Sequence, residues 1–154
     1  MTMKYTVHSI EETYNIAKMV ADKLVGKEII LLNGDLGAGK TTFTKGIAKA
    51  LGISDVVTSP TFTFMKEYEG RLNLYHFDMY RVEEADELYE LGLNDYLGMD
   101  GGVCVIEWNK FEGIENPIII NIEVIDETTR KIVINEDSSN WCNITKISSS
   151  VIWW

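Results

Sequence analysis

The stretch that decides the fold is Gly34-Asp-Leu-Gly-Ala-Gly-Lys-Thr41, which has the spacing Gly-x-x-x-x-Gly-Lys-Thr. It follows the short apolar run 28–33, the pattern of a buried strand. It precedes residues 42–51, whose apolar positions have helical spacing and which end at Gly52. A strand, a glycine-rich loop and a helix in this order predict a loop that binds the phosphates of a nucleotide.

The backbone of the loop is suited to an anion. We expect Gly34, Gly37 and Gly39 to adopt positive φ angles and to bring the chain close to a ligand without a Cβ in the way. Successive N–H groups from Gly37 through Ala38 and Gly39, together with the positive end of the following helix, would then point at phosphate oxygens. These positions are the predicted backbone contacts of the ligand.

The side chains that follow complete the predicted site. Lys40 is expected to reach the phosphates as a positive charge, and the Thr41 hydroxyl is placed to bind Mg²⁺. Thr42 is a further expected donor to phosphate. Asp35 carries the wrong charge for an anion site, so we expect it to point outward.

Composition bounds the class of protein. The chain has 154 residues, 45% of them hydrophobic, and a formal charge of 14 − 24 = −10, with no stripe of Lys or Arg. Direct, tight binding of a nucleic acid is therefore not expected. The N-terminal residues lack the pattern of a signal peptide, and apolar runs such as 118–120 are too short to cross a bilayer, so the sequence predicts a cytoplasmic protein with no membrane segment.

The order of patterns predicts an α/β fold. We expect strands at 4–7, 28–33, 61–68, 71–78, 102–106, 118–125 and 131–135, and helices at 9–25, 42–51 and 83–91. The third and fourth strands, and the last two, are predicted to form antiparallel hairpins. The expected architecture is a P-loop NTPase-like three-layer sandwich whose central sheet is mixed and mainly parallel. Residues 1–137 would form the domain and 138–154 a tail of uncertain order.

Two carboxylates sit where predicted strands end. Asp78 follows Leu74–Phe77, and Glu107 follows Val103–Ile106. Either could be the acid on the metal side of the nucleotide. We favour Glu107, because its strand is more uniformly apolar, and assign Asp78 to the attacking water. The competing interpretation of Asp78 is a helix cap or a pair with Arg81, and His76 is interpreted as a residue of the sheet.

Five motifs together resemble one family. They are 34–42 (GDLGAGKTT), 59–62 (SPTF), 76–81 (HFDMYR), 87–92 (ELYELG) and 106–108 (IEW). In this order and at these separations they are similar to the bacterial TsaE (YjeE) family, the ATPase of tRNA threonylcarbamoyladenosine synthesis. The resemblance runs from the first predicted helix to about Asn135 and does not include the tail.

The resemblance implies a Mg-dependent ATPase that is weak alone and works with TsaB- and TsaD-like partners. It implies ATP and Mg²⁺ as cofactors, and tRNA contacted only through the partner complex. Thr41 and Glu107 would bind Mg²⁺, Asp78 would support hydrolysis, and the segment 59–62 would act as a switch near the γ-phosphate. By position, Thr13, Lys110 and Arg130 are candidate nucleotide contacts.

Three alternatives remain, and the first is a nucleotide-binding module with no useful hydrolysis of its own. A small GTPase-like switch is suggested by Asn109-Lys110-Phe-Glu112, which imitates a guanine-reading Asn-Lys-x-Asp motif but ends in Glu. A small-molecule kinase would require an acceptor pocket and an arginine-rich lid. Only three arginines occur in the chain, and no basic helix resembles a lid.

Overall fold

The structure is a computed structural model that describes residues 2–35, 37–60, 62–136 and 151–152. Its elements, in chain order, are β1 (Thr2–Val7), α1 (Ile10–Asp22), β2 (Ile29–Asn33), α2 (Lys40–Ala50), β3 (Met65–Tyr68), β4 (Asn73–Asp78), α3 (Ala85–Glu90), η1 (Leu93–Tyr96), β5 (Gly102–Glu107), β6 (Ile118–Val124), β7 (Arg130–Asn135) and β8 (Val151–Ile152). Most of the predicted tail lies outside the described residues.

One mixed sheet organises these elements. Its strand order is β3-β4-β5-β2-β6-β7-β1-β8. The central strands β4, β5, β2 and β6 run parallel. The two predicted hairpins, β3–β4 and β6–β7, are antiparallel, and β1 adds antiparallel to β7. The predicted mixed, mainly parallel sheet with antiparallel hairpins is confirmed.

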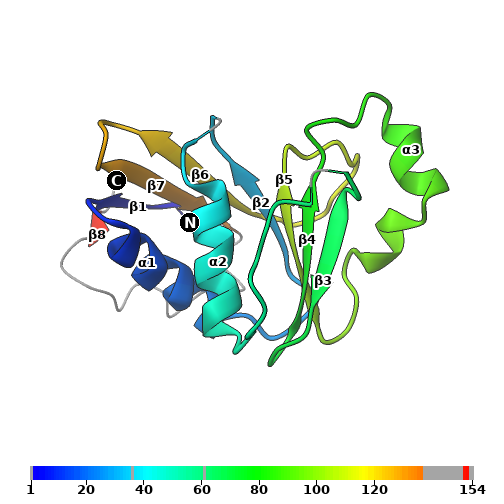
Figure 1. Ribbon diagram of the computed structural model, residues 1–154, viewed down its shortest axis with the longest axis horizontal. Coiled ribbons are helices and arrows are strands. Elements are labelled where there is room, and N and C mark those ends of the chain that lie inside the picture. The colour runs from blue at the N-terminus through cyan, green and yellow to red at the C-terminus, as the bar shows by residue number, and fades with distance from the viewer. Residues whose placement is uncertain (1, 36, 61, 137–150, 153–154) are drawn as a thin grey trace.

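Helices cover both faces of the sheet, as Figure 1 shows. On one face, Ile30, Leu74, Val103 and Val105 pack in a cluster with α1 and α2. On the other face, the alternate strand residues pack with α3 and η1; they include Tyr75, Phe77, Cys104 and Ile106. Because successive strand residues point to opposite faces, one run of apolar residues supplies both cores. The three-layer architecture follows.

The first helix ends earlier than predicted. Its start is as expected, because the Glu12 N–H donates to Ser9 Oγ at 3.1 Å as an N-cap. Its end lies at Asp22, not near Val25. The Glu28 carboxylate accepts from the N–H groups of Val25 and Gly26 and draws the chain away from the helix.

The strand predicted at 61–68 is shorter than expected. It begins at Met65, because the Phe64 N–H donates to the Pro60 carbonyl at 3.1 Å and Phe64 adopts φ 64°. A non-glycine residue at positive φ closes a turn and cannot continue a strand. Residues 62–64 therefore form a bend that leads into the sheet.

Helices α1 and α2 touch through a glycine. A Cβ on Gly46 would lie 2.6 Å from Ala17 Cβ and 3.1 Å from the Tyr14 ring. The backbones of the two helices are therefore closer to each other than they could be with a side chain at position 46. Since α2 begins at the glycine-rich loop, this contact fixes the direction in which the start of α2 points.

We expect Gly46→Ala to destabilise the protein by about 0–2 kcal/mol. Alanine improves the helix by about 1 kcal/mol, but forcing a methyl group into a packed interface costs about 1–3 kcal/mol. The matched control is Lys45→Ala, an exposed neighbour on the same helix. Chemical denaturation followed by circular dichroism measures both. A Gly46→Ala protein about 1 kcal/mol more stable than the control, the full gain in helix propensity, would contradict the close approach.

Candidate nucleotide-binding site

The glycine-rich loop uses its glycines in two different ways. Gly37 has φ 79° and Gly39 has φ 111°, and a Cβ at either position would meet nothing within 4 Å. These two residues have the predicted positive φ and border open space. The prediction of positive φ at Gly34 was wrong. A Cβ there would lie 2.7 Å from the Ile122 carbonyl oxygen, so close packing against β6 requires this glycine.

The start of α2 presents unpaired backbone donors. Gly39 is the N-cap, and the first N–H to donate within the helix is that of Phe43, to the Gly39 carbonyl at 2.9 Å. The N–H groups of Lys40, Thr41 and Thr42 precede that bond and have no acceptor inside the helix. A helix start of this kind attracts anions.

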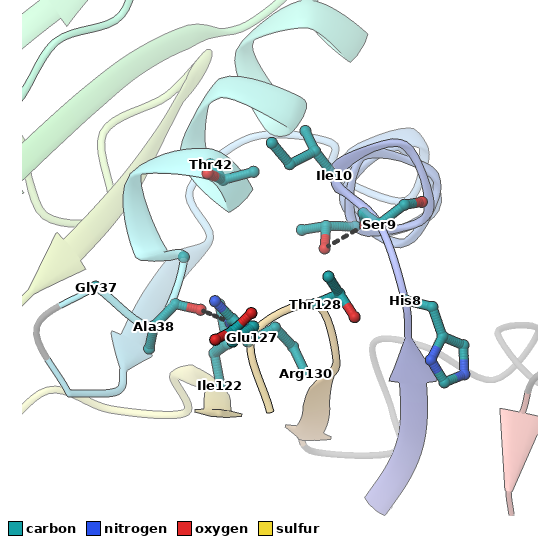
Figure 2. A pocket seen from close by; sticks show the side chains of 12 residues that line it. His8, Ser9, Ile10, Gly37, Ala38, Thr42, Ile122, Glu127, Thr128 and Arg130 are labelled. Atoms are coloured by element: carbon teal, nitrogen blue, oxygen red, sulfur yellow. Dashed lines mark hydrogen bonds between the residues drawn. The ribbon is translucent and has the colours of Figure 1, made fainter. Parts of the chain in front are cut away.

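A cavity of about 480 Å³ opens beside the loop. Figure 2 shows that its walls come from the loop, the start of α1 and the β6–β7 hairpin. Six of the predicted contacts, from segments far apart in the sequence, line this cavity together: Thr13, Gly37, Ala38, Gly39, Thr42 and Arg130. The ends of α1 and β7 are thus placed beside the loop.

Arg130 fixes one wall of the cavity. Its Nε donates to the Ala38 carbonyl at 3.0 Å, and its Nη1 donates to the carbonyls of Asp126 at 2.8 Å and Thr129 at 3.1 Å. One guanidinium therefore ties the loop to the hairpin, as the dashed bond in Figure 2 shows. Asp126 also accepts N–H bonds from the hairpin turn, and these bonds lower the pKa of its carboxyl.

Lys40 is buried at the end of the loop. Its Nζ donates to the Gly34 carbonyl at 2.6 Å and lies 3.7 Å from the centre of the Trp108 ring. Burial lowers the pKa of Lys40, although the carboxylates of Glu107, Asp78 and Asp35 act in the opposite direction. The positive charge is thus held close to the loop at a cost in solvation. Asp35 itself is exposed, as predicted.

The two strand-end acids lie next to each other. Asp78 and Glu107 are register partners at the carboxyl ends of the parallel strands β4 and β5. Glu107 is buried and bonded to His76, whereas Asp78 accepts from Ser59 Oγ at 2.9 Å and from the Tyr80 N–H at 3.0 Å. The guanidinium of Arg81 lies over the Phe62 ring. One of the two hydrogen bonds of the Asp78 carboxylate is therefore with the predicted switch segment, through Ser59.

Three predicted contacts, Lys40, Thr41 and Lys110, do not line this cavity, and Lys110 is exposed. Asn109, the first residue of the GTPase-like motif, accepts from the Phe111 N–H at 2.9 Å and donates to the Phe111 carbonyl at 3.2 Å. Its amide is used in a local turn. This arrangement gives no support to guanine recognition by Asn109 and Lys110.

Trp108 was not predicted as part of the site. It adopts φ 55°, and its ring contacts the Tyr80 ring edge-on at 5.0 Å as well as the Lys40 ammonium. Strained backbone is concentrated at functional sites. The sequence signal for Trp108 was its place directly after Glu107, in the motif 106–108.

The donor set fits a magnesium ion shared with a ligand. Within residues 2–35, 37–60 and 62–136, no group of three or more His, Cys, Asp or Glu side chains could hold a metal alone. The hydroxyl of Thr41 and the carboxylate of Glu107 are hard oxygen donors, which suit Mg²⁺. Such an ion characteristically keeps waters and binds substrate phosphates together with one or two protein ligands.

These features define a P-loop NTPase-like α/β protein. A solved structure titled "Crystal structure of Bacillus subtilus YdiB" superimposes with a TM-score of 0.79 and 35% identity, covering 95% of this chain and 93% of that one. The family model described as "Threonylcarbamoyl adenosine biosynthesis protein TsaE" matches residues 7–133. The chain belongs to the TsaE family, which acts in tRNA threonylcarbamoyladenosine biosynthesis.

Individual relatives agree. The chain is 51% identical over 107 residues to the tRNA threonylcarbamoyladenosine biosynthesis protein TsaE of Bacillus subtilis, an alignment that covers 69% of this chain and 66% of that protein. It is 39% identical to the TsaE protein of Rickettsia prowazekii, over 87% of this chain and 95% of that one.

Among the described residues, no helix is both long and apolar enough to span a membrane.

We expect Lys40→Met to leave the ligand-free protein at least as stable as the wild type near neutral pH. Burial lowers the pKa of Lys40, so the folded state binds fewer protons than the unfolded state between that lowered pKa and 10.5. The contribution of Lys40 to stability therefore increases with pH in that window. The unfolding free energy of Lys40→Met should therefore lack this increase with pH, whereas the exposed control Lys45→Met should show it as the wild type does. Urea denaturation from pH 7 to 10 measures the unfolding free energy of each protein. Equal pH slopes for the two variants would contradict the prediction.

Proposed function

We propose that this protein binds ATP and Mg²⁺ and hydrolyses ATP as the nucleotide-dependent component of the tRNA threonylcarbamoyladenosine machinery. The supporting observations are the open cavity at Gly37–Gly39, directly before the buried Lys40 in the chain, and two acids paired at the carboxyl ends of adjacent parallel strands. A phosphate loop alone would bind a nucleotide. The acids add the means to hold a metal and to orient water.

Each site residue has a proposed role. The backbone from Gly37 to Thr42 surrounds the phosphates, with Lys40 supplying positive charge and Thr42 a hydroxyl donor. Thr41 and Glu107 hold Mg²⁺, which neutralises developing charge on the phosphates when bound. Asp78 orients the attacking water.

The remaining contacts are assigned to the rest of the nucleotide. Thr13 and Arg130 line the cavity, whereas Lys40 does not, and we assign Thr13 and Arg130 to the sugar and base of ATP. Thr13 is nearly buried, and its hydroxyl donates to the Ser9 carbonyl at 3.3 Å. Lys110, which is exposed and does not line this cavity, remains a predicted contact.

The partners are proposed from the family. TsaB- and TsaD-like proteins would hold the tRNA, since a chain with a net charge of −10 is unsuited to hold it directly. Ser59 connects the predicted switch segment to Asp78, and Phe62 in the same segment is 81% exposed. A change at the γ-phosphate would therefore reach an exposed aromatic residue. ATP hydrolysis by this chain alone would be weak. The partner proteins would complete the ATPase, and the assembly would work in the cytoplasm.

Calorimetric titration with ATP and GTP tests the binding step. We expect ATP to bind in preference to GTP, and Lys40→Met to weaken binding at least tenfold because it removes the buried charge near the phosphates. Lys45→Met is the matched control and should bind as the wild type does. Retention of full ATP affinity by Lys40→Met, or preference for GTP, would overturn the proposal.

Phosphate release with and without purified partners then separates an ATPase from a binding module.

We expect Glu107→Gln to lower Mg²⁺-dependent turnover by at least about 100-fold while changing ATP affinity far less. The amide keeps the size of the carboxylate but removes the charge that would hold the metal. Single-turnover phosphate release and calorimetry provide the two readouts. Equal losses in both would remove Glu107 from the metal site.

A further inference from the structure

A buried histidine lies behind the proposed metal-side acid. The His76 Nε2 atom and the Glu107 Oε2 atom are 2.5 Å apart, and the two side chains are 0% and 4% exposed. His76 is in the middle of β4, two residues before Asp78, and β4 pairs in parallel with β5. Neither the proposed phosphate contacts nor the proposed water position uses His76.

Strand alternation places this pair on the site's side of the sheet. Leu74, two residues before His76, packs in the core beneath α1 and α2, and so do Val103 and Val105 on β5. Side chains two residues apart share a face, so His76, Asp78 and Glu107 point to that same face. It is the face against which α2, the helix that begins at the phosphate loop, is packed.

The direction of this hydrogen bond follows from the proposed role of Glu107. A carboxylate that holds Mg²⁺ is ionised and only accepts, so Nε2 is the donor. The other ring nitrogen, Nδ1, is buried and has no hydrogen-bond partner within the described part of the chain. An unpaired buried N–H costs more than a bare ring nitrogen, so the arrangement fits a neutral imidazole with its proton on Nε2. Glu107 uses only Oε2 for this bond.

Packing alone does not account for the pair. Apolar residues of similar volume would fill the same space at equal or greater stability, because burying polar and charged groups is costly. His76 thus introduces a fully buried polar side chain into β4, within hydrogen-bond distance of Glu107. Metal-binding carboxylates are characteristically held by such a second hydrogen bond, which sets their orientation.

We propose that His76 is a positioning residue: its Nε2–H holds Oε2 of Glu107 so that Oε1 remains directed to the Mg²⁺ of bound ATP. This inference rests on the proposed function. It assigns His76 no contact with the nucleotide. Its effect should therefore appear in the coupling between Mg²⁺ and ATP, with metal-free nucleotide binding unchanged.

Two amide substitutions provide the test. The amide nitrogen of Gln reaches the position of Nε2, whereas that of Asn reaches only the position of Nδ1, which has no partner here. Both replacements are polar and buried, so both are expected to lower thermal stability to a similar degree. His76→Gln should keep the bond to Glu107, and His76→Asn should lose it. Leu74→Ala, in the same strand and core, is the control for destabilisation alone.

The readout is Mg²⁺ titration of the complex with a non-hydrolysable ATP analogue, followed by calorimetry. We expect His76→Asn to weaken the apparent Mg²⁺ affinity by roughly 10- to 100-fold, the range for lost outer-shell partners. His76→Gln and Leu74→Ala should remain within about threefold of the wild type, and metal-free affinity should be unchanged in all. These results would support the inference.

Three outcomes would overturn it. Equal Mg²⁺ affinity in His76→Asn and the wild type would show that Glu107 needs no positioning. His76 would have only a structural role if His76→Gln lost as much Mg²⁺ affinity as His76→Asn. The same conclusion would follow if Leu74→Ala lost as much Mg²⁺ affinity as His76→Asn. A wild-type protein whose analogue binding does not respond to Mg²⁺ would remove the proposed function itself, a result distinguishable from the other two because it needs no variant.

Discussion

The site depends on the parallel register of β4, β5 and β2. Parallel strands bring their carboxyl ends to one edge of the sheet, where the chain leaves β2 to form the phosphate loop and α2. Asp78 and Glu107 occupy the last positions of their strands and are register partners. No loop has to fold in a special way to bring these acids together, because the sheet's backbone hydrogen bonds already do so.

A second constraint is the desolvation of charge at this edge. Lys40 and Glu107 are both nearly buried, and each has a specific partner close by: the Gly34 carbonyl and the Trp108 ring for Lys40, and His76 for Glu107. Charges held in this way are oriented before any ligand arrives. Less reorganisation is then required when a charged ligand binds. The cost in folding stability is one that functional sites commonly carry.

Much of this was readable from the sequence, and the limits have physical reasons. The strand, loop and helix around Lys40, both hairpins and the acid-ended strands followed from local patterns of apolar residues, glycines and turns. The early end of α1 did not, because it depends on Glu28 accepting N–H bonds from the chain before it. The role of Gly34 was also hidden, since it is set by the Ile122 carbonyl nearly ninety residues later. His76 and Trp108 gain their meaning only from neighbours across the sheet and loop.

The bond from Arg130 to the Ala38 carbonyl has a consequence for how the protein is made. The loop is encoded in the first third of the chain, but one of its walls is completed by a residue near the end of the described domain. During synthesis the early segments leave the ribosome well before Arg130 does. Contacts across such a separation form late, because their chain-closure entropy must first be overcome. A nascent chain halted before β7 would thus contain the complete phosphate motif while its cavity still lacked a wall.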